Sequence, residues 1–578
     1  MTTFEPPFRP LPLRDWLVER LWRARHALDG AKERPAAQDT PTRILVVLIF
    51  FSLGFAVMAA GAATKALWPQ ERSGYVTPPV ARADLVDRNG RILAMDLTHY
   101  ALYVDPREVW DTAEAREKLA AVLPGVPARR IERVLRGKRR AFLAGPLTPQ
   151  QKQQVHDLGL PGVFFEEQDR RVYPLGASAA HVLGFTDKGG QGLAGAESAL
   201  DELVQDEGQK GRPVALSIDM RVQTALEDEL QKAAAEFRTV AAMGVVVDVH
   251  TGEVLGMASY PDFDPNHAGR SPPANMVNRE AASVYELGSI FKVFTLAMAL
   301  DKGLATLDSK FDVRAPLQVA GQSIHDHEKG DTVLTFSEVF THSSNIASGK
   351  MALMAGPEVV RDYFFERYGL AHPAPIELAE AARPILPRKV GSQAVANMAF
   401  GQGISVSPLS YAAAMAAIVN GGEHIPLTVR KMAPGDQVKG RRILKPSTSR
   451  TMLDLLRLNV LTGSGKKADA PGLRVGGKTG SAQKPENGRY GHNNISSFAG
   501  VFPTDGPMDT KRYLVLITLD APQRTEHTYG FITAGWNAAP TAGKVIDRIG
   551  PYLGVKRAPL SVQQAEKAAA MAPMRGDN

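Results

Sequence analysis

The longest apolar stretch of the chain covers residues 44–63 and reads ILVVLIFFSLGFAVMAAGAA. These twenty residues carry no charge, and a helix that rises about 1.5 Å per residue would span a hydrocarbon core of about 30 Å. A secretory signal peptide is the alternative interpretation, but a cleavable signal rarely follows a polar leader of 43 residues. We therefore predict a retained transmembrane helix at residues 44–64.

The leader, residues 1–43, holds eight lysine and arginine residues. Because cations near a membrane span favour the cytoplasmic side, the leader is predicted to stay inside and the remainder of the chain to be exported. The expected topology is a single membrane crossing, with the N-terminus in the cytoplasm and the folded part on the extracytoplasmic side.

The pattern after the anchor is mixed, which indicates an α+β domain at residues 65–220. Asn89-Gly90 between two apolar runs is a strong hairpin signal. The other predicted elements are helices at 109–123, 127–135 and 148–158, the last capped by Thr148, and a glycine-rich stretch at 184–195.

A second, larger domain is predicted at residues 221–555. It begins with a helix at 221–237 and a β-hairpin at 245–258, and its later apolar segments predict helices at 289–302, 336–355 and 408–419 and strands at 473–475, 495–502 and 513–519. Strands at both ends with helices between them predict one antiparallel sheet flanked by helices, an α/β layered fold. Residues 556–578 are predicted to be a flexible tail.

Composition excludes several classes of protein. The chain has 578 residues, of which 44% are hydrophobic and 22% charged, so it is neither disordered nor collagen-like. The net charge is only +7, and we discern no dense basic block, so nucleic-acid binding is not expected. The absence of cysteine removes disulfides, thiolate nucleophiles and cysteine-ligated metals from consideration.

One serine is a candidate nucleophile. A serine hydroxyl needs a base within hydrogen-bond reach, and residues i and i+3 of a helix share a face. In Ser289-Ile-Phe-Lys292 the lysine can therefore lie beside the serine, and the apolar surroundings favour its neutral, basic form. Ser-x-x-Lys also occurs at Ser464 and Ser481, but only the first opens an apolar helix. Alone, Ser289 would be interpreted as a helix cap.

Two further motifs change this interpretation. Ser343-Ser-Asn345 lies 54 residues after Ser289, in a predicted connection between helices, and Lys478-Thr-Gly480 lies 135 residues after Ser343, in a predicted strand. This order of Ser-x-x-Lys, Ser-x-Asn and Lys-Thr-Gly is the motif set of penicillin-binding proteins and class A β-lactamases. Gly480, with Gly476 and Gly477, predicts a bare strand edge that a peptide backbone can approach closely.

With these motifs in place, the chain resembles a monofunctional class B penicillin-binding protein, and the resemblance extends from the anchor almost to the tail. The segments that carry it are RADLVDRNGR at 82–91, RVYPLG at 171–176 with AHVLGFTD at 180–187, GLAGAE at 192–197, VDVHTGEVLGMA at 247–258, NGG at 420–422 and VGGKTGSAQK at 475–484. The sequence of the second segment, RVYPLG with AHVLGFTD, is more similar to the division-specific, FtsI-type branch of this family than to the elongation branch. Two positions depart from the family pattern, because Leu287 replaces a proline and Ser481 a threonine.

The resemblance implies a penicillin-binding transpeptidase domain at 221–555 and a non-catalytic, dimerisation-like pedestal at 65–220. It implies that Ser289 attacks the penultimate D-Ala of a peptidoglycan stem peptide, with Lys292 as general base. Ser343 would relay the proton and Asn345 would hold the substrate amide. Lys478 would supply positive charge, the hydroxyls of Thr479 and Ser481 would bind the terminal carboxylate, and the backbone N–H groups of Ser289 and Ser481 would form the oxyanion hole.

The resemblance also implies septal cross-linking of stem peptides, inhibition by β-lactams, and partners in the division machinery, particularly a polytopic glycan polymerase. No cofactor or metal is expected: His325-Asp-His327 could share a strand face, but no further ligand is evident nearby. A β-lactamase is disfavoured because no Glu-x-x-Asn occurs in the chain. A β-lactam receptor without turnover, a structural division component, a D,D-carboxypeptidase and an elongation-type transpeptidase stay open as alternatives.

Overall fold

The computed structural model describes residues 47–56, 58, 82–327, 332–433, 435–436, 438–486 and 489–571. The chain divides into two compact units, residues 1–78 and 79–578. In the first unit, residues 47–56 and 58 are helical and exposed, and the remainder of the predicted anchor and the leader lies outside the described residues. Among the described residues no helix is both long and apolar enough to cross a bilayer. The anchor stays a prediction.

The second unit opens with the pedestal, whose strands form one sheet in the order β3-β2-β1-β5, with β4 paired to β2. The predicted Asn89-Gly90 hairpin is confirmed, since β1 pairs antiparallel with β2. Thr148 caps α5 through a capping box with Gln151. The elements are β1 (Leu85–Val86), β2 (Ile92–Val104), α3 (Thr112–Val122), α4 (Ala128–Leu135), β3 (Ala141–Leu147), α5 (Pro149–His156), β4 (Val163–Val172), α6 (Ala180–Leu183), α7 (Gly195–Ala199), α8 (Asp201–Gln209) and β5 (Val214–Ala215).

A buried ion-pair network joins the three pedestal segments that carry the family resemblance. The carboxylate of Glu197 is fully buried and accepts hydrogen bonds from Arg82 at 2.7 Å and Arg171 at 2.6 Å. Arg82 also pairs with Asp201 at 2.5 Å and Arg171 with Asp96 at 3.1 Å. A buried charge needs such partners, so the network fixes how these segments pack.

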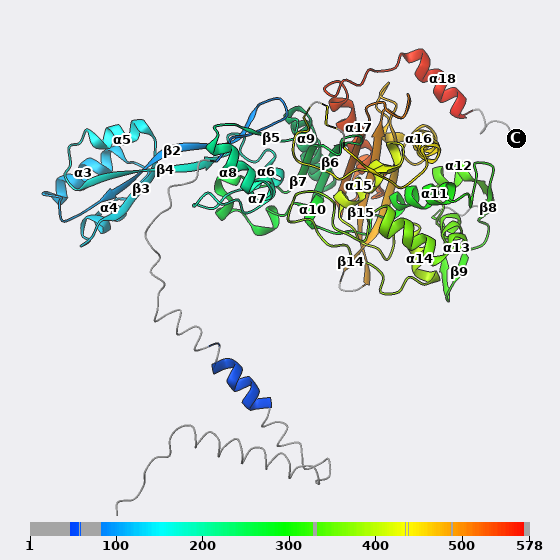
Figure 1. Ribbon diagram of the computed structural model, residues 1–578, viewed down its shortest axis with the longest axis horizontal. Coiled ribbons are helices and arrows are strands. Elements are labelled where there is room, and N and C mark those ends of the chain that lie inside the picture. Colours follow the sequence, from blue (N-terminus) through cyan, green and yellow to red (C-terminus); the bar gives the residue numbers. More distant parts are fainter. Residues whose placement is uncertain are drawn as a thin grey trace, which may run out of the picture. The chain divides into compact units, whose positions relative to one another are not determined.

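The larger domain is built on the predicted antiparallel sheet, in the order β14-β15-β16-β6-β7. Every residue of β6 and β16 is buried, because helices cover both faces of the sheet (Figure 1). One apolar cluster joins α9 and α17 to the sheet, and the other joins it to α11 and α15. The central elements are α9 (Met220–Phe237), β6 (Ala241–Asp248), β7 (Val254–Tyr260), α11 (Lys292–Asp301), α15 (Pro408–Val419), β14 (Gly476–Glu486), β15 (Arg489–Phe502), β16 (Tyr513–Asp520) and α17 (Ala538–Ile549).

The segment between α11 and α15 forms a helical region with short strands at its edge. Its elements and the remaining ones are α10 (Arg279–Ala282), β8 (Lys310–Asp312), β9 (Leu317–Val319), β10 (Gln322–Ile324), β11 (Val333–Thr335), α12 (Phe336–Thr341), α13 (Asn345–Arg361), α14 (Ser392–Met398), β12 (Glu423–His424), β13 (Arg441–Arg442), α16 (Pro446–Leu461) and α18 (Leu560–Met571).

Three local predictions need correction. The strand expected at 473–475 is not formed, because Arg474 has a left-handed φ of +51° and β14 begins only at Gly476. The helix expected at 336–355 is broken into α12 and α13. The segment expected to be a flexible tail contains α18, whose Glu566 forms a bidentate pair with Arg457 at 2.7 and 2.8 Å.

Candidate active site

The candidate nucleophile lies in a tight turn rather than in the first turn of an α-helix. Residues Gly288–Phe291 form a 3-10 turn that continues into α11, which begins at Lys292 and not at Ser289 as predicted. Gly288 has a φ of +62°, and a Cβ atom there would lie 2.9 Å from the carbonyl oxygen of Ser481. The turn is therefore held against strand β14, and only glycine fits at its entry.

Three segments of the chain converge on Ser289. The Nζ atom of Lys292 lies 3.0 Å from the Oγ of Ser289 and 3.0 Å from the Oγ of Ser343, and it also donates to the Ser343 carbonyl oxygen. The Nζ of Lys478 donates to the same Ser343 hydroxyl, at 3.0 Å. The serine and lysine side chains of the three motifs thus form one continuous hydrogen-bonded chain.

Burial sets the protonation of the two lysines. Both side chains are fully buried. Burial, with a smaller contribution from the neighbouring Lys478 charge, holds the pKa of Lys292 well below its ordinary value. Burial alone lowers the pKa of Lys478 to about 7. Lys292 is therefore the amine suited to accept a proton, and Lys478 is near the midpoint of its titration at neutral pH.

The Ser343–Asn345 loop is held by an aspartate whose role the sequence did not indicate. Asp326 accepts hydrogen bonds from the backbone N–H groups of Asn345 and Ile346 and, at 2.7 Å, from the hydroxyl of Ser344. The carboxylate thereby caps the N-terminus of α13, where unpaired N–H groups favour negative charge. Ser343, between α12 and α13, has a left-handed φ of +61°. This strained residue breaks the helix predicted at 336–355.

Asp326→Ala is expected to slow acylation of Ser289 about 10–100-fold, because it frees two backbone donors and lets Ser343 move away from Lys292. Asp326→Glu should retain part of the rate, since a carboxylate is kept. The measurement is the second-order rate of labelling by a fluorescent penicillin. Wild-type rates in Asp326→Ala would refute the positioning role.

Asn345 and Thr479 both have partners besides any substrate. The Nδ2 of Asn345 donates to the carbonyl oxygen of His325 at 3.0 Å. The hydroxyl of Thr479 lies 2.7 Å from that of Ser464, the serine of a second Ser-x-x-Lys match that the sequence analysis set aside. Ser464 thus positions a motif residue instead of acting as a nucleophile.

The remaining residues of the Lys-Thr-Gly strand are held by their backbone neighbours. The Oγ of Ser481 accepts the N–H of Ala534 at 2.9 Å, which leaves its own hydroxyl proton available to a ligand. A Cβ atom at Gly480 would lie 2.4 Å from the carbonyl oxygen of Leu287. The nucleophile turn thus approaches this glycine closely, and the approach of a peptide backbone to the strand edge stays a prediction.

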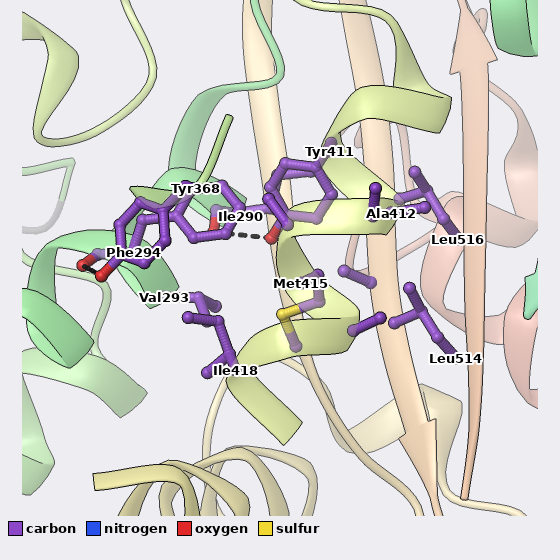
Figure 2. Packing of buried hydrophobic residues seen from close by; sticks show 14 of the residues in the cluster. Ile290, Val293, Phe294, Tyr368, Tyr411, Ala412, Met415, Ile418, Leu514 and Leu516 are labelled. Carbon is purple, nitrogen blue, oxygen red and sulfur yellow. Dashed lines mark hydrogen bonds between the residues drawn. The ribbon is translucent and has the colours of Figure 1, made fainter. Parts of the chain in front are cut away.

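Two buried tyrosines fix the backbone that carries Lys292. The hydroxyl of Tyr411 donates to the carbonyl oxygen of Ile290 at 2.9 Å, and that of Tyr368 donates to the carbonyl oxygen of Phe294 at 3.1 Å (Figure 2). The surrounding aromatic and aliphatic side chains are fully buried. Leu287, which stands where the family has proline, is also fully buried in this core. The nucleophile turn is thus anchored on a rigid base.

One buried histidine belongs to the pedestal. His181 is buried, its Nε2 lies 2.8 Å from the carbonyl oxygen of Asn275, and burial lowers its pKa to about 4, so it is a packed structural histidine. Within the described residues no cluster of three or more histidine, cysteine or carboxylate side chains suited to a metal is present.

Comparisons with known proteins agree with this geometry. Residues 242–538 match the family model of the penicillin-binding protein transpeptidase domain, and residues 77–211 match that of the penicillin-binding protein dimerisation domain. The chain therefore belongs to the penicillin-binding proteins that carry a transpeptidase domain. Within this family it is an FtsI-type D,D-transpeptidase.

Two relatives and one solved structure are similar to the chain over most of its length. It is 51% identical to the probable peptidoglycan D,D-transpeptidase FtsI of Caulobacter vibrioides, over 98% of both chains. It is 30% identical to the peptidoglycan D,D-transpeptidase FtsI of Escherichia coli K12, over 78% of this chain and 81% of the relative. A crystal structure of penicillin-binding protein 3 from Mycobacterium tuberculosis, complexed with aztreonam, matches with a TM-score of 0.64 and 25% identity, over 83% of this chain and 98% of that one.

Proposed function

We propose that the chain cross-links peptidoglycan stem peptides during septal wall synthesis, through an acyl-enzyme on Ser289. The observation that carries this proposal is the contact of the Lys292 amine with the hydroxyls of both Ser289 and Ser343, at 3.0 Å each. Neutral Lys292 takes the Ser289 proton as Oγ attacks the carbonyl carbon of the penultimate D-Ala. This step forms the tetrahedral oxyanion, and a positioned base contributes about 10²–10⁴ in rate.

Collapse of the intermediate breaks the C–N bond to the terminal D-Ala. The leaving amine takes a proton that Ser343 passes on from Lys292, along the chain of contacts between the two side chains. The released D-Ala is replaced by the amine of a second stem peptide, which attacks the ester, gives up its proton by the reverse route and frees Ser289. The products are one cross-link and the regenerated hydroxyl.

The Lys-Thr-Gly strand and the backbone of the nucleophile turn bind the negative charges of the substrate carboxylate and of the oxyanion. The ammonium form of Lys478 and the hydroxyls of Thr479 and Ser481 bind the terminal carboxylate, and Asn345 holds the substrate amide. The backbone N–H groups of Ser289 and Ser481 bind the oxyanion, each contributing about 10²–10³ in rate. The close packing of the Ser289 turn on Ser481 supports this assignment.

The proposed cellular setting follows from the first 64 residues. The apolar run at 44–64 anchors the chain once in the inner membrane, and the arginine-rich leader keeps the N-terminus in the cytoplasm. The pedestal and transpeptidase domains then face the periplasm, where β-lactams acylate Ser289. A polytopic glycan polymerase and other division proteins are the proposed partners.

The test is to treat the full-length protein with penicillin and map the adduct by mass spectrometry. The adduct is expected on the peptide that contains Ser289 and is expected to be absent in Ser289→Ala. Turnover is tested separately with lipid II and a glycan polymerase. Labelling without any cross-linked product or released D-Ala would instead support a receptor without turnover, and released D-Ala without cross-links would support a carboxypeptidase.

The pH profile gives a further prediction. Catalysis needs Lys292 neutral, so activity rises with pH through the depressed pKa of that amine. It also needs Lys478 charged, so activity falls as pH rises through a pKa of about 7. The second-order rate of penicillin acylation, which reports the free enzyme, is therefore expected to be bell-shaped, with its alkaline limb near pH 7. Lys478→Arg should move that limb to higher pH, and an unchanged limb would contradict the assignment.

A further inference from the structure

The pedestal carries a dense basic segment. Residues 129–140 read RRIERVLRGKRR, with six arginines, one lysine and a single acidic residue, Glu132. The expectation of a chain without a basic block is thus wrong for this segment. It comprises most of α4 and the loop to β3, in the lobe formed by α3, α4, α5 and strands β2, β3 and β4 (Figure 1).

The cations of this segment are exposed, and most have no carboxylate partner. Arg129, Arg133, Arg136, Lys138 and Arg139 are solvent-exposed, and none of them forms an ion pair with a described residue. Glu132, within the segment, pairs with Arg116 at 2.8 Å, and the nearby Asp105 pairs with Arg107 at 2.6 Å. Of the segment's cations, Arg140 pairs with Glu166 at 2.6 Å. The five exposed cations are therefore not neutralised by an ion pair with a described residue.

The arginines of α4 are regularly spaced. Arg129 and Arg133 lie in α4 and Arg136 is its C-cap, with a helical backbone. They stand at positions i, i+4 and i+7, so they share one face over about 10 Å. A guanidinium binds a carboxylate through two parallel hydrogen bonds, which makes such a row specific for carboxylates at matching intervals. An antiparallel helix with acidic residues at i, i+4 and i+7 places its carboxylates at intervals that match these arginines.

Aromatic side chains contact two other arginines of the segment, Arg130 and Arg140. The Arg140 guanidinium lies 4.8 Å from the ring centroid of Tyr103 and 5.0 Å from that of Phe164, and Arg130 lies 5.3 Å from that of Phe142. Trp110 is 91% exposed, in a loop whose Pro106 packs near Gly137. Arginine and tryptophan are enriched among the energetically dominant residues of protein–protein interfaces, and this part of the lobe exposes both.

We propose that this basic face, defined as Arg129, Arg133, Arg136, Arg139 and Trp110, binds an acidic helix of a partner protein. Charge complementarity favours an acidic partner, and the composition favours a protein. Six of the seven cations are arginine, which protein interfaces favour over lysine, whereas attraction to an anionic bilayer draws on either residue. The face contains none of the proposed catalytic residues. An experiment can therefore refute the binding proposal without refuting the proposed chemistry at Ser289, and the reverse also holds.

The test uses the full-length protein in uncharged detergent micelles and a fluorescein-labelled helical peptide with glutamate at i, i+4 and i+7. The control ligand is the same peptide with glutamine in place of each of these glutamates. Fluorescence anisotropy is expected to show saturable binding of the glutamate peptide alone, weakened by added salt. The triple variant R129E/R133E/R136E is expected to weaken binding at least about tenfold, and Trp110→Ala is expected to weaken it as well.

The control variant K302E/K389E/K544E makes the same change in net charge at exposed lysines elsewhere on the second unit. It should bind the peptide within about twofold of wild type, because screening limits the reach of distant surface charges. Penicillin acylation should be unchanged in both triple variants, which verifies that they fold. Equal binding of both peptides, or equal loss in both triple variants, would overturn the proposal. So would a preference of the basic face for phosphatidylglycerol vesicles or isolated peptidoglycan over the peptide.

Discussion

Replacing Lys292 with methionine is expected to slow acylation of Ser289 by about 10⁴-fold or more. The Nζ of Lys292 contacts the hydroxyls of Ser289 and Ser343 and the carbonyl oxygen of Ser343, so the substitution removes the base and breaks the proton route together. Loss of one member of such a unit costs far more than a single hydrogen bond, because the remaining members cannot act without it. The measurement is the second-order rate of labelling by a fluorescent penicillin.

Methionine matches the length of the buried lysine stem without a polar head, so the fold should persist. Lys302→Met, at the exposed end of α11, is the matched control and should label at the wild-type rate. Ser289→Ala, which lacks the proposed nucleophile, gives the background level of labelling. Labelling of Lys292→Met within about tenfold of wild type would mean that another group deprotonates Ser289.

Glu197→Gln is expected to lower the free energy of local unfolding of the pedestal by about 3–5 kcal/mol, the range for breaking a buried ion pair. The Glu197 side chain is completely buried between Arg82 and Arg171, whose side chains are 2% and 3% exposed. A neutral amide leaves each desolvated guanidinium with only its second, partly exposed carboxylate, Asp201 for Arg82 and Asp96 for Arg171. Native-state hydrogen exchange of peptides from the pedestal measures the effect region by region.

The control for this substitution is Glu114→Gln, in an exposed pair with Lys118 on α3. Such surface pairs contribute about 0–1 kcal/mol, so exchange should barely change. If Glu197→Gln and Glu114→Gln had equal effects, the network would not be the link that holds the pedestal segments together. Penicillin acylation of Glu197→Gln at low temperature would show whether the loss stays within the pedestal.

Local signals in the sequence predicted several elements closely. Asn89-Gly90 defined the hairpin of β1 and β2, and the apolar run before Asn420-Gly421 gave α15 at its observed bounds, because both depend on turn chemistry and short-range periodicity. The helix at 336–355 failed where a non-local contact decided the outcome. Asp326, outside that helix, accepts the first backbone N–H groups of α13, which begins two residues after the left-handed Ser343.

In the candidate site, too, some residues were predicted from the sequence and others became apparent only from tertiary contacts. Motif order alone indicated Ser289, Lys292, Ser343 and Lys478, and the structure brings these four side chains into contact. The supporting residues were missed, because a single aspartate or serine has no sequence signal of its own. Asp326 stands in the sequence only between the two histidines of a His-x-His pair, and Ser464 only in a Ser-x-x-Lys match that opens no apolar helix.

By itself, the sequence determined which residues have the chemistry of an acyl transferase and the type of local element in which most of them lie. Both follow from the order of side chains and their spacing along the chain. Only the tertiary structure decided the reactivity of Lys292 and Lys478, since their pKa values depend on burial by segments distant in sequence. It also decided that the pedestal arginines of α4 stay exposed and largely unpaired, because exposure is a property of the packed molecule rather than of the chain.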